Sequence, residues 1–353
     1  MADLEVDKVD VAGVIDNIKR VDLTPCPYFL STGCTILDLA IADRLPGGFG
    51  GGRISQIYGE ESTAKTVIVT EALGSAQRSG GFAYFEDAEF TFDFPRSHLF
   101  GINTSERWEY KNPSSIEELF DDHVASILKA RESGCPVGVV GVDSLSALPS
   151  LVEKDGKLGE KSYGTSRAKV ISAAFRKYEC ALNEKNLAMV FVDQARDNVG
   201  VVFGDPLVVS GGRALMFYAS TRVRVTHGGK IQNSKGIVVG VKVNFSVVKN
   251  KIAPPFRSGS FRILFDYGIC DISSSLEWLR KWDTEQYKEY GGSMKGAPYI
   301  FGSDKKKSLD GMVKFIEDSK LEAGLRIRVE LVWKKTYACR ERPPKKRWED
   351  QNL

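Results

Sequence analysis

The residues best suited to chemistry form a phosphate-binding pattern, Gly59-Glu60-Glu61-Ser62-Thr63-Ala64-Lys65-Thr66. An apolar segment precedes them, and an amphipathic segment begins near Lys65. A strand, a tight turn and a helix in this order point successive backbone N–H groups at phosphate oxygens. The lysine of such a loop reaches the outer phosphates, and the Thr66 hydroxyl holds Mg²⁺. We therefore predict a phosphate site. The alternative is a chance turn before a helix, and Ala64 stands where the pattern usually has glycine.

Hydrolysis of a bound phosphate needs a carboxylate for Mg²⁺. The apolar segment from Val137 to Val142 is followed by Asp143. Carboxyl ends of parallel strands meet at one edge of a sheet, beside the phosphate loop. We therefore expect Asp143 to bind Mg²⁺ through water. The alternative is an aspartate that only caps the next segment.

A general base is expected at the same edge of the sheet. The apolar segment from Phe82 to Glu86 leads into Asp87 and Glu89. Glu89 could polarise the attacking water. Glu86 and Asp87 remain alternatives that spacing does not separate. Gln194 follows another apolar segment, and its amide could sense the γ-phosphate and start a change in the loop behind it.

These side chains need a framework of strands and helices. Apolar and amphipathic segments alternate up to about Gly211, which predicts a mostly parallel α/β sheet with helices on both faces. Beyond that residue, polar and apolar residues alternate every second position, as in antiparallel strands added to a sheet. We expect helices at 36–42, 67–77, 116–128 and 169–182, parallel strands at 54–58, 82–86, 137–142 and 187–192, and antiparallel strands at 219–225, 236–250 and 261–265.

Composition excludes several classes of protein. A chain of 353 residues allows one large domain and a smaller one. The net charge of +3 does not by itself indicate a nucleic-acid partner. Six scattered cysteines without a Cys-x-x-Cys motif indicate reduced thiols of a cytoplasmic protein, and three histidines argue against a histidine-rich metal site. The N-terminus does not read as a signal peptide, and no apolar run could span a bilayer.

Together these motifs resemble those of RecA-family recombinases, over about residues 29–270 and more loosely to about Lys335. The resemblance implies an α/β fold with a RecA-type P-loop ATPase core at 31–272. It adds an N-terminal oligomerisation segment at 1–30, a small α+β C-terminal domain at 273–338 and a basic flexible tail at 339–353. The matching segments are 31–33, the phosphate loop, Asp87-Ala88-Glu89, 142–148, Gln194, 200–206, 211–215, 217–220 and 248–253.

The resemblance also implies roles for the matched residues. Lys65, Glu89 and Gln194 correspond to catalytic residues, and Thr66 and Asp143 to magnesium ligands. Lys249 and Lys251 correspond to a pair that reaches the γ-phosphate of a neighbouring subunit. Two lysines at i and i+2 of a strand share one face, although a solvated strand edge would have the same pattern. The implied nucleotide contacts are Gly59, Glu60, Glu61, Ser62, Thr63, Ala64, Lys65, Thr66, Asp93 and Arg96.

Two loops, about 149–164 and 195–212, resemble the DNA-binding loops of the family. Their glycines allow close approach to a backbone, their cations neutralise phosphates, and their aromatic residues could stack on bases. An ordinary surface loop is the alternative for any single residue. The candidate DNA contacts are Tyr163, Arg167, Lys169, Ser172, Arg176, Arg196, Asn198, Val199, Gly200, Phe203, Gly211, Gly212 and Arg213.

The chain departs from the family pattern at several places. Besides Ala64, Glu60 replaces a proline of the loop. The two aromatic residues of the base pocket fall near Arg96 and Ile272, and Arg96 could still stack as a planar cation. The tail is basic where typical bacterial members are acidic, which would attract duplex DNA or merely solubilise the chain.

We therefore expect a cytoplasmic, ATP- and Mg²⁺-dependent recombinase that forms helical homo-oligomers on single-stranded DNA and pairs it with double-stranded DNA. Single-strand-binding and mediator proteins are further expected partners, and a membrane is not. The rival hypotheses are a non-exchanging regulatory paralogue and a ring-forming helicase on a related core.

Overall fold

The computed structural model describes residues 26–131, 137–156, 164–197, 207–209, 213–290 and 297–338. Its centre is one large sheet with the strand order β12-β11-β10-β9-β3-β7-β6-β4-β5, and β8 lies beside the end of β7. The strands from β9 to β5 in this order run parallel, and β10, β11 and β12 are antiparallel additions. The strands are β3 (Ile54–Gly59), β4 (Phe82–Asp87), β5 (Trp108–Lys111), β6 (Gly138–Asp143), β7 (Ala188–Asp197), β8 (Leu207–Val209), β9 (Thr221–Gln232), β10 (Val238–Asn250), β11 (Ser258–Leu264) and β12 (Gly268–Ile269).

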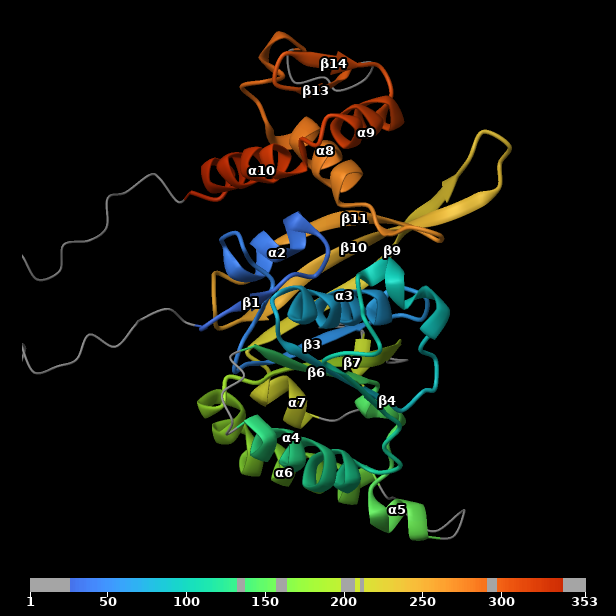
Figure 1. Ribbon diagram of the computed structural model, residues 1–353, viewed down its shortest axis with the longest axis vertical. Coiled ribbons are helices and arrows are strands. Elements are labelled where there is room, and N and C mark those ends of the chain that lie inside the picture. The colour runs from blue at the N-terminus through green and yellow to red at the C-terminus, as the bar shows by residue number, and fades with distance from the viewer. Residues whose placement is uncertain are drawn as a thin grey trace, which may run out of the picture.

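Helices cover both faces of this sheet (Figure 1). Alternate residues of β7 explain why both faces are apolar: Val190 and Val192 belong to the core under α3, and Met189 and Phe191 belong to the core under α4 and α6. The predicted α/β class is confirmed. On one face lie α2 (Thr35–Ala42) and α3 (Lys65–Arg78), and on the other α4 (Ala125–Ala130), α6 (Gly164–Glu184) and α7 (Arg213–Tyr218).

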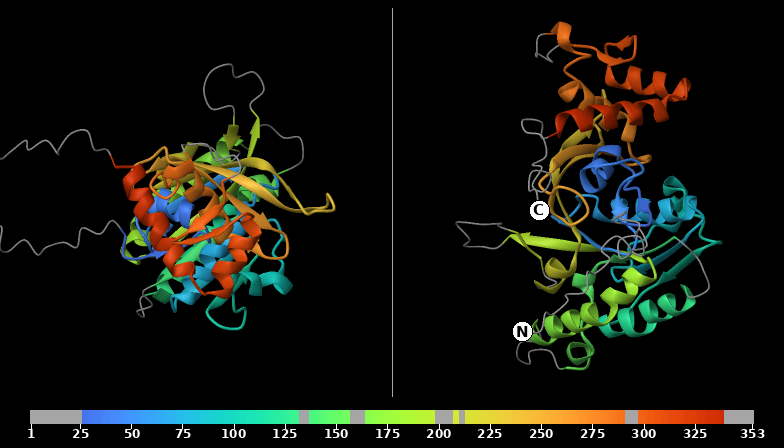
Figure 2. Two further views of the ribbon diagram at one scale, coloured as in Figure 1. Left: turned by 90° about the horizontal axis from the view of Figure 1, so that it is seen from above. Right: turned by 90° about the vertical axis from the view of Figure 1, so that its left-hand side faces the viewer.

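The C-terminal elements form a cap at one end of the molecule (Figures 1 and 2). They share the hydrophobic core of α2 and α3, to which the fully buried Trp333 belongs. The indole N–H of Trp333 also donates a hydrogen bond to Asp43, 3.1 Å away. Arg257 lies over the Trp333 ring and also pairs with Asp43. The cap consists of α8 (Asp271–Trp282), η5 (Lys288–Tyr290), β13 (Tyr299–Phe301), β14 (Asp304–Lys306), α9 (Leu309–Asp318) and α10 (Glu322–Thr336).

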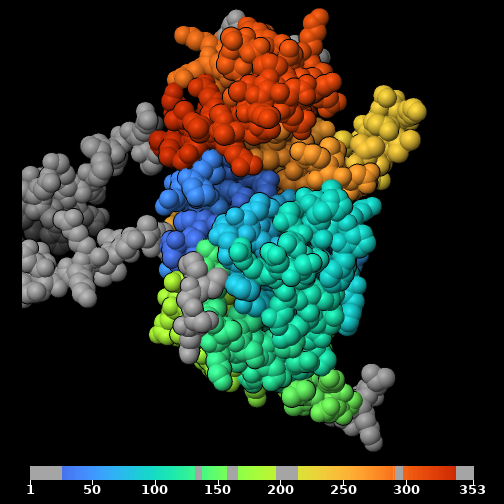
Figure 3. Space-filling model, in the orientation of Figure 1, coloured from blue at the N-terminus to red at the C-terminus, as the bar shows by residue number. Residues whose placement is uncertain are grey.

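Several short elements complete the fold. A two-stranded ribbon, β1 and β2, precedes the phosphate loop. The hairpin between β9 and β10 is longer than predicted and projects from the body (Figure 3). The remaining short elements are β1 (Phe29–Leu30), β2 (Phe49–Gly50), η1 (Phe94–Phe100), η2 (Glu118–Val124), η4 (Leu145–Ala147) and α5 (Leu151–Asp155).

Three predictions of local structure need correction. The expected α-helix at 116–128 contains a π-helical stretch, η2, and the Ser115 hydroxyl accepts from the N–H of Glu118 at its start. β7 continues to Asp197 because its last residues pair with β8, so part of the second predicted loop is a strand ladder. The first predicted loop contains α5, whose first turn is capped by the Ser150 hydroxyl.

Candidate active site

The phosphate loop joins β3 to α3 as predicted. Gly59 must be glycine, because a Cβ there would lie 2.0 Å from the carbonyl oxygen of Val225 on β9. Ser62 and Ala64 have φ angles of 55° and 64°, in the left-handed region that favours glycine. The backbone conformation therefore explains why glycine is usual at position 64.

Lys65 is almost fully buried, and its Nζ donates to the carbonyl oxygens of Gly59, at 3.1 Å, and Glu60, at 2.6 Å. Burial lowers the pKa of this lysine, and the carboxylates of Asp143 and Glu89 oppose that shift. The Glu60 side chain is turned outward and lies 4.0 Å from His227. The loop thus carries the cation of Lys65. The carboxylate of Glu60, which stands where the family has a proline, lies in solvent.

Thr66 and Asp143 meet at the edge of the sheet. The Thr66 hydroxyl donates to Asp143 Oδ2 over 2.5 Å. Burial raises the pKa of Asp143 to about 6, an effect that the hydrogen bond from Thr66 opposes. A hydroxyl and a carboxylate beside a phosphate loop are the oxygen donors that Mg²⁺ uses together with substrate phosphates. Among the described residues no group of three or more His, Cys, Asp or Glu side chains is placed to hold a metal ion.

Glu89 faces a cavity beside the phosphate loop, and the volume of this cavity is about 360 Å³. Its Oε1 accepts from the Ser144 hydroxyl at 2.7 Å and from Gln194 Nε2 at 3.4 Å. Glu89 and Gln194 therefore touch one another, which connects a candidate base with the residue that opens the second loop. The cavity is lined by Glu61, Ser62, Thr63, Ala64, Lys65, Thr66, Glu89, Asp143, Val192 and Gln194.

The two alternatives to Glu89 lie elsewhere. Glu86 is buried against His123 of η2, whose Nδ1 is 2.7 Å from its carboxylate. Asp87 is buried as well and accepts hydrogen bonds from the backbone of the loop that carries Glu89. Neither residue lines the cavity.

The expected base pocket lies away from this cavity. Arg96 is half exposed and pairs with Asp93, at 3.4 Å, and with Asp266, at 3.8 Å. Ile272, by contrast, is buried in α8 and cannot offer a ring face to a base. Sequence reasoning overlooked the half-exposed rings of Phe265 and Tyr267, which flank Asp266.

Lys249 lies near the end of β10 and Lys251 directly follows the strand, and neither lines the cavity of its own chain. Lys249 donates to carbonyl oxygens at the end of α7. Burial lowers the pKa of Lys249, and the nearby charge of Lys251 lowers it further.

The candidate DNA contacts are only partly described. Lys169 and Arg176 are exposed on α6, and Ser172 lies half-buried between them. The guanidinium of Arg167 donates to the carbonyl of Leu145, 2.7 Å away, so it is turned into the protein. Arg196 and Arg213 lie on β7 and α7. The remaining candidates, Tyr163, Asn198, Val199, Gly200, Phe203, Gly211 and Gly212, lie outside the described residues, as do most of the N-terminal segment and the basic tail.

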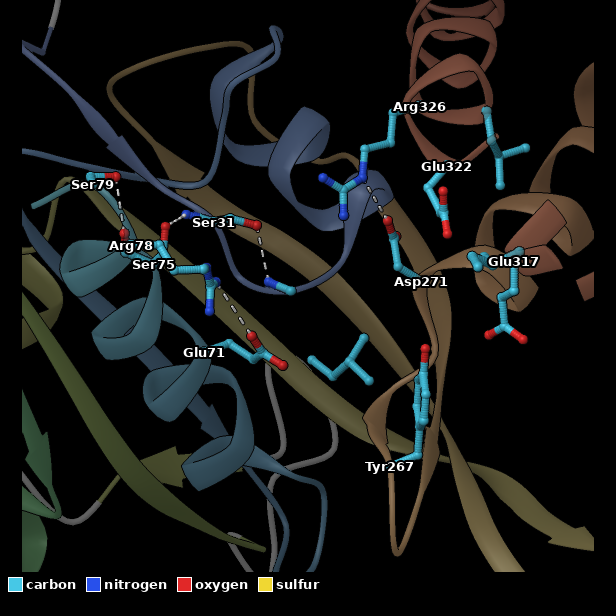
Figure 4. Close-up of a pocket in the computed structure, with 14 residues that line it drawn as sticks. Ser31, Glu71, Ser75, Arg78, Ser79, Tyr267, Asp271, Glu317, Glu322 and Arg326 are labelled. Carbon is cyan, nitrogen blue, oxygen red and sulfur yellow. Dashed lines mark hydrogen bonds and ion pairs between the residues drawn. The ribbon is translucent and has the colours of Figure 1, made fainter. Parts of the chain in front are cut away.

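A larger cavity, about 580 Å³, lies between α3 and the C-terminal cap (Figure 4). Glu71 and Arg78 face each other across 3.8 Å, and Arg326 of α10 pairs with Asp271. Burial raises the pKa of Glu71 to about 7. The carboxylates that line this cavity make it unsuited to a phosphate. The sequence did not predict this cavity.

Comparison with known proteins points to the same family that the sequence motifs resemble. The family model described as the RecA N-terminal domain matches residues 18–270. The chain is 37% identical over 290 residues to Protein RecA of Methylococcus capsulatus, covering 80% of this chain and 78% of the relative. It is 34% identical over 303 residues to Protein RecA of Treponema denticola, covering 86% and 69%. It is 36% identical over 277 residues to Protein RecA of Borrelia hermsii, covering 78% and 73%.

Proposed function

Because this chain belongs to the RecA family, we propose that its loop from Gly59 to Thr66 binds ATP at the interface between two protomers of a filament. Members of the family are DNA-dependent ATPases that act in homologous recombination, and this chain is one of them. The observation that carries the site is the convergence of Lys65, the Thr66–Asp143 pair and Glu89 on one cavity.

Each residue around the cavity would have a separate role in ATP hydrolysis. Lys65 would balance charge on the outer phosphates, and Thr66 and Asp143 would hold Mg²⁺. When bound, Mg²⁺ neutralises charge that develops on the phosphate oxygens. Glu89 would accept the proton of the water whose oxygen attacks the γ-phosphorus, as the bond to the leaving β-phosphate oxygen breaks. The contact from Gln194 to Glu89 would report the state of the nucleotide to the second loop.

Lys249 and Lys251 would act on the site of a neighbouring protomer. They lie away from the cavity of their own chain, which supports a role in trans. Cations supplied from a second subunit stabilise the charge of the transferring phosphoryl group. ATP would then join protomers, and hydrolysis would release them.

DNA would lie along α6 and the two loops. Lys169 and Arg176 are exposed there, and between Pro206 and Phe265 the sequence has ten Lys or Arg residues and no Asp or Glu. The exposed cations of this stretch favour a polyanion, whereas Arg222 and Arg257 are buried and Lys242 and Arg262 pair with Glu277. We propose that the protein coats single-stranded DNA as a helical filament and pairs it with homologous duplex, with base pairing reading the sequence.

The proposed function also assigns roles to the domains and terminal segments of the chain. We propose that the ATPase core ends at the start of α8, near residue 270, rather than inside that helix at 272. The N-terminal segment would join protomers, and the basic tail would hold duplex DNA. Within the described ranges no helix has the length and apolarity to cross a membrane. A cytoplasmic location and partnership with single-strand-binding and mediator proteins stay predictions.

The experiment that tests the proposal is ATP hydrolysis with and without single-stranded DNA. Lys65→Ala and Glu89→Gln should each lower the DNA-stimulated rate by at least about 100-fold. Lys314→Ala, which removes an exposed lysine of α9, should not change it. Normal hydrolysis by Lys65→Ala would refute the site. Electron microscopy with ATP and DNA should show filaments, whereas closed rings would indicate a helicase and hydrolysis without strand exchange a regulator.

A further inference from the structure

We propose that Asp87 is a positioning residue for ATP hydrolysis, whose carboxylate fixes the loop that carries Glu89. This inference rests on the function proposed above, in which Glu89 accepts a proton from the attacking water.

The Asp87 side chain is fully buried at the end of β4, where the strand pairs with Asp143 of β6. It does not line the cavity that Lys65 and Glu89 face. An ionised carboxylate only accepts hydrogen bonds, so its surroundings must supply donors. Asp87 therefore acts through the groups that it binds.

Four donors converge on this carboxylate. Oδ1 accepts from the backbone N–H of Glu89 at 3.1 Å. Oδ2 accepts from the N–H groups of Thr91 and Phe92, both at 2.9 Å, and from the hydroxyl of Tyr110 at 3.0 Å. Three of the four donors belong to the backbone of the loop itself, so the carboxylate holds that loop, together with the carbonyl oxygen of Asp143, which accepts from the N–H groups of Ala88 and Glu89.

That path contains a turn that the chain would not adopt readily. Phe90 has a φ angle of 56°, in the left-handed region, which is unfavourable for a side chain of this size. The hydrogen bonds from Glu89 and Thr91 to Asp87 flank Phe90 on both sides. They hold the turn that brings the Glu89 carboxylate to the buried Ser144 hydroxyl and to the cavity.

A second layer of contacts holds Asp87 in turn. Asn112, which follows β5, donates to the carbonyl oxygen of Asp87 at 2.7 Å and to the hydroxyl of Tyr110 at 3.0 Å. The outermost parallel strand thus contributes to the position of Glu89. A misplacement of about 1 Å can lower an enzymatic rate by about 100-fold, so this precision matters.

The test is the Asp87→Asn variant, in which an NH₂ group replaces one acceptor oxygen and faces N–H donors. We expect kcat for DNA-stimulated hydrolysis, measured per nucleotide-binding site, to fall at least about tenfold, and the KM for ATP to change less than about twofold. Tyr110→Phe removes one donor only and should lower kcat about two- to threefold without changing KM. This milder variant keeps the test valid should Asp87→Asn fold poorly.

A double variant separates positioning from a general loss of structure. If Asp87 acts through Glu89, then Asp87→Asn combined with Glu89→Gln should retain the same residual rate as Glu89→Gln alone. Glu86→Gln is the matched control, because Glu86 is the neighbouring buried carboxylate on β4 but contacts His123 instead of the loop. It should leave kcat unchanged.

The outcomes are distinguishable. Unchanged kcat in both Asp87→Asn and Tyr110→Phe, or losses that multiply in the double variant, would overturn the role of Asp87 and leave the function of Glu89 intact. Full activity of Glu89→Gln would overturn the proposed function of Glu89 and this inference with it.

Discussion

The ammonium group of Lys249 donates a hydrogen bond to the carbonyl oxygen of Phe217, 2.7 Å away, and a second to that of Met216, at 2.8 Å. Both carbonyls belong to the last turn of α7, where backbone oxygens have no partner within the helix. Since α7 begins directly after the second predicted DNA loop, Lys249 connects the end of β10 with the segment that follows that loop.

Removal of Lys249 should therefore have two effects. Lys249→Met should abolish most DNA-stimulated hydrolysis and also destabilise the fold by about 2 kcal/mol, because two charge-assisted hydrogen bonds are lost. Lys251 is exposed, so Lys251→Met should lower hydrolysis without changing the melting temperature. Thermal denaturation of both variants measures the difference, and identical melting temperatures would contradict this reading of the Lys249 contact.

Ala64 should be a site where glycine stabilises. Its φ of 64° costs an L-residue about 1 kcal/mol or more, so Ala64→Gly should raise the free energy of unfolding by up to about 1 kcal/mol. The control is Ala72→Gly in the interior of α3, which should lower stability by about 1 kcal/mol or more. Denaturant unfolding of the two variants checks the sign, and a destabilised Ala64→Gly protein would count against the left-handed conformation.

Stability should fall as pH rises through the window set by Glu71. Its pKa is about 7 in the folded protein against an ordinary 4.5, chiefly through burial, with Asp38 and Asp271 adding to the shift and Arg78 opposing it. Between these values the native state keeps a proton that the unfolded chain releases, so folding weakens with increasing pH. The buried Asp38, with a pKa of about 6, acts in the same direction.

Glu71→Gln should remove the part of this dependence that comes from Glu71. The variant should be more stable than the parent at pH 8, by on the order of 2 kcal/mol, and similar near pH 4.5. Glu317→Gln, an exposed carboxylate of the same cavity, should change neither value. Melting temperatures from pH 4.5 to 8 provide the measurement, and parallel curves for Glu71→Gln and the parent would refute the assignment.

Exposed and inward-facing cations of α6 should behave differently toward DNA. Lys169→Ala and Arg176→Ala should each weaken single-stranded DNA binding and reduce the salt slope by about 0.7, because each loses one phosphate contact. Arg167→Ala should instead lower the melting temperature, since its guanidinium binds the Leu145 carbonyl. Fluorescence anisotropy over a salt series checks the slopes, and an unchanged slope for both exposed residues would place the DNA elsewhere.

Local patterns were sufficient to predict which candidate residues meet at the ends of parallel strands. Lys65 and Thr66 follow a strand and open a helix, and Asp143 ends the neighbouring strand, so topology brings them together. The alternation of apolar residues likewise predicted the sheet and most of its strands. These features depend on residues close in the sequence and on the fixed geometry of parallel strands.

Contacts between distant segments were not predictable. Spacing did not exclude Glu86 and Asp87 beside Glu89; what separates them is the contact of Glu86 with His123 and the hydrogen bonds of Asp87 with the loop backbone and Tyr110. The inward turn of Arg167 likewise depends on a carbonyl 22 positions away. Nor did the sequence show that the base-pocket position near Ile272 is buried in α8.

The central claim is that ATP lies between two protomers, with the phosphate loop from one and the paired lysines from the next. The direct measurement is the rate of ATP hydrolysis by a mixture of two proteins on single-stranded DNA. One carries Lys65→Ala and the other carries both Lys249→Met and Lys251→Met; they are mixed at equal concentration, and each is inactive alone. In a random mixed filament roughly a quarter of the head-to-tail interfaces combine an intact loop with intact lysines, so about a quarter of the parent hydrolysis rate should return. A mixture as inactive as its components would contradict the account.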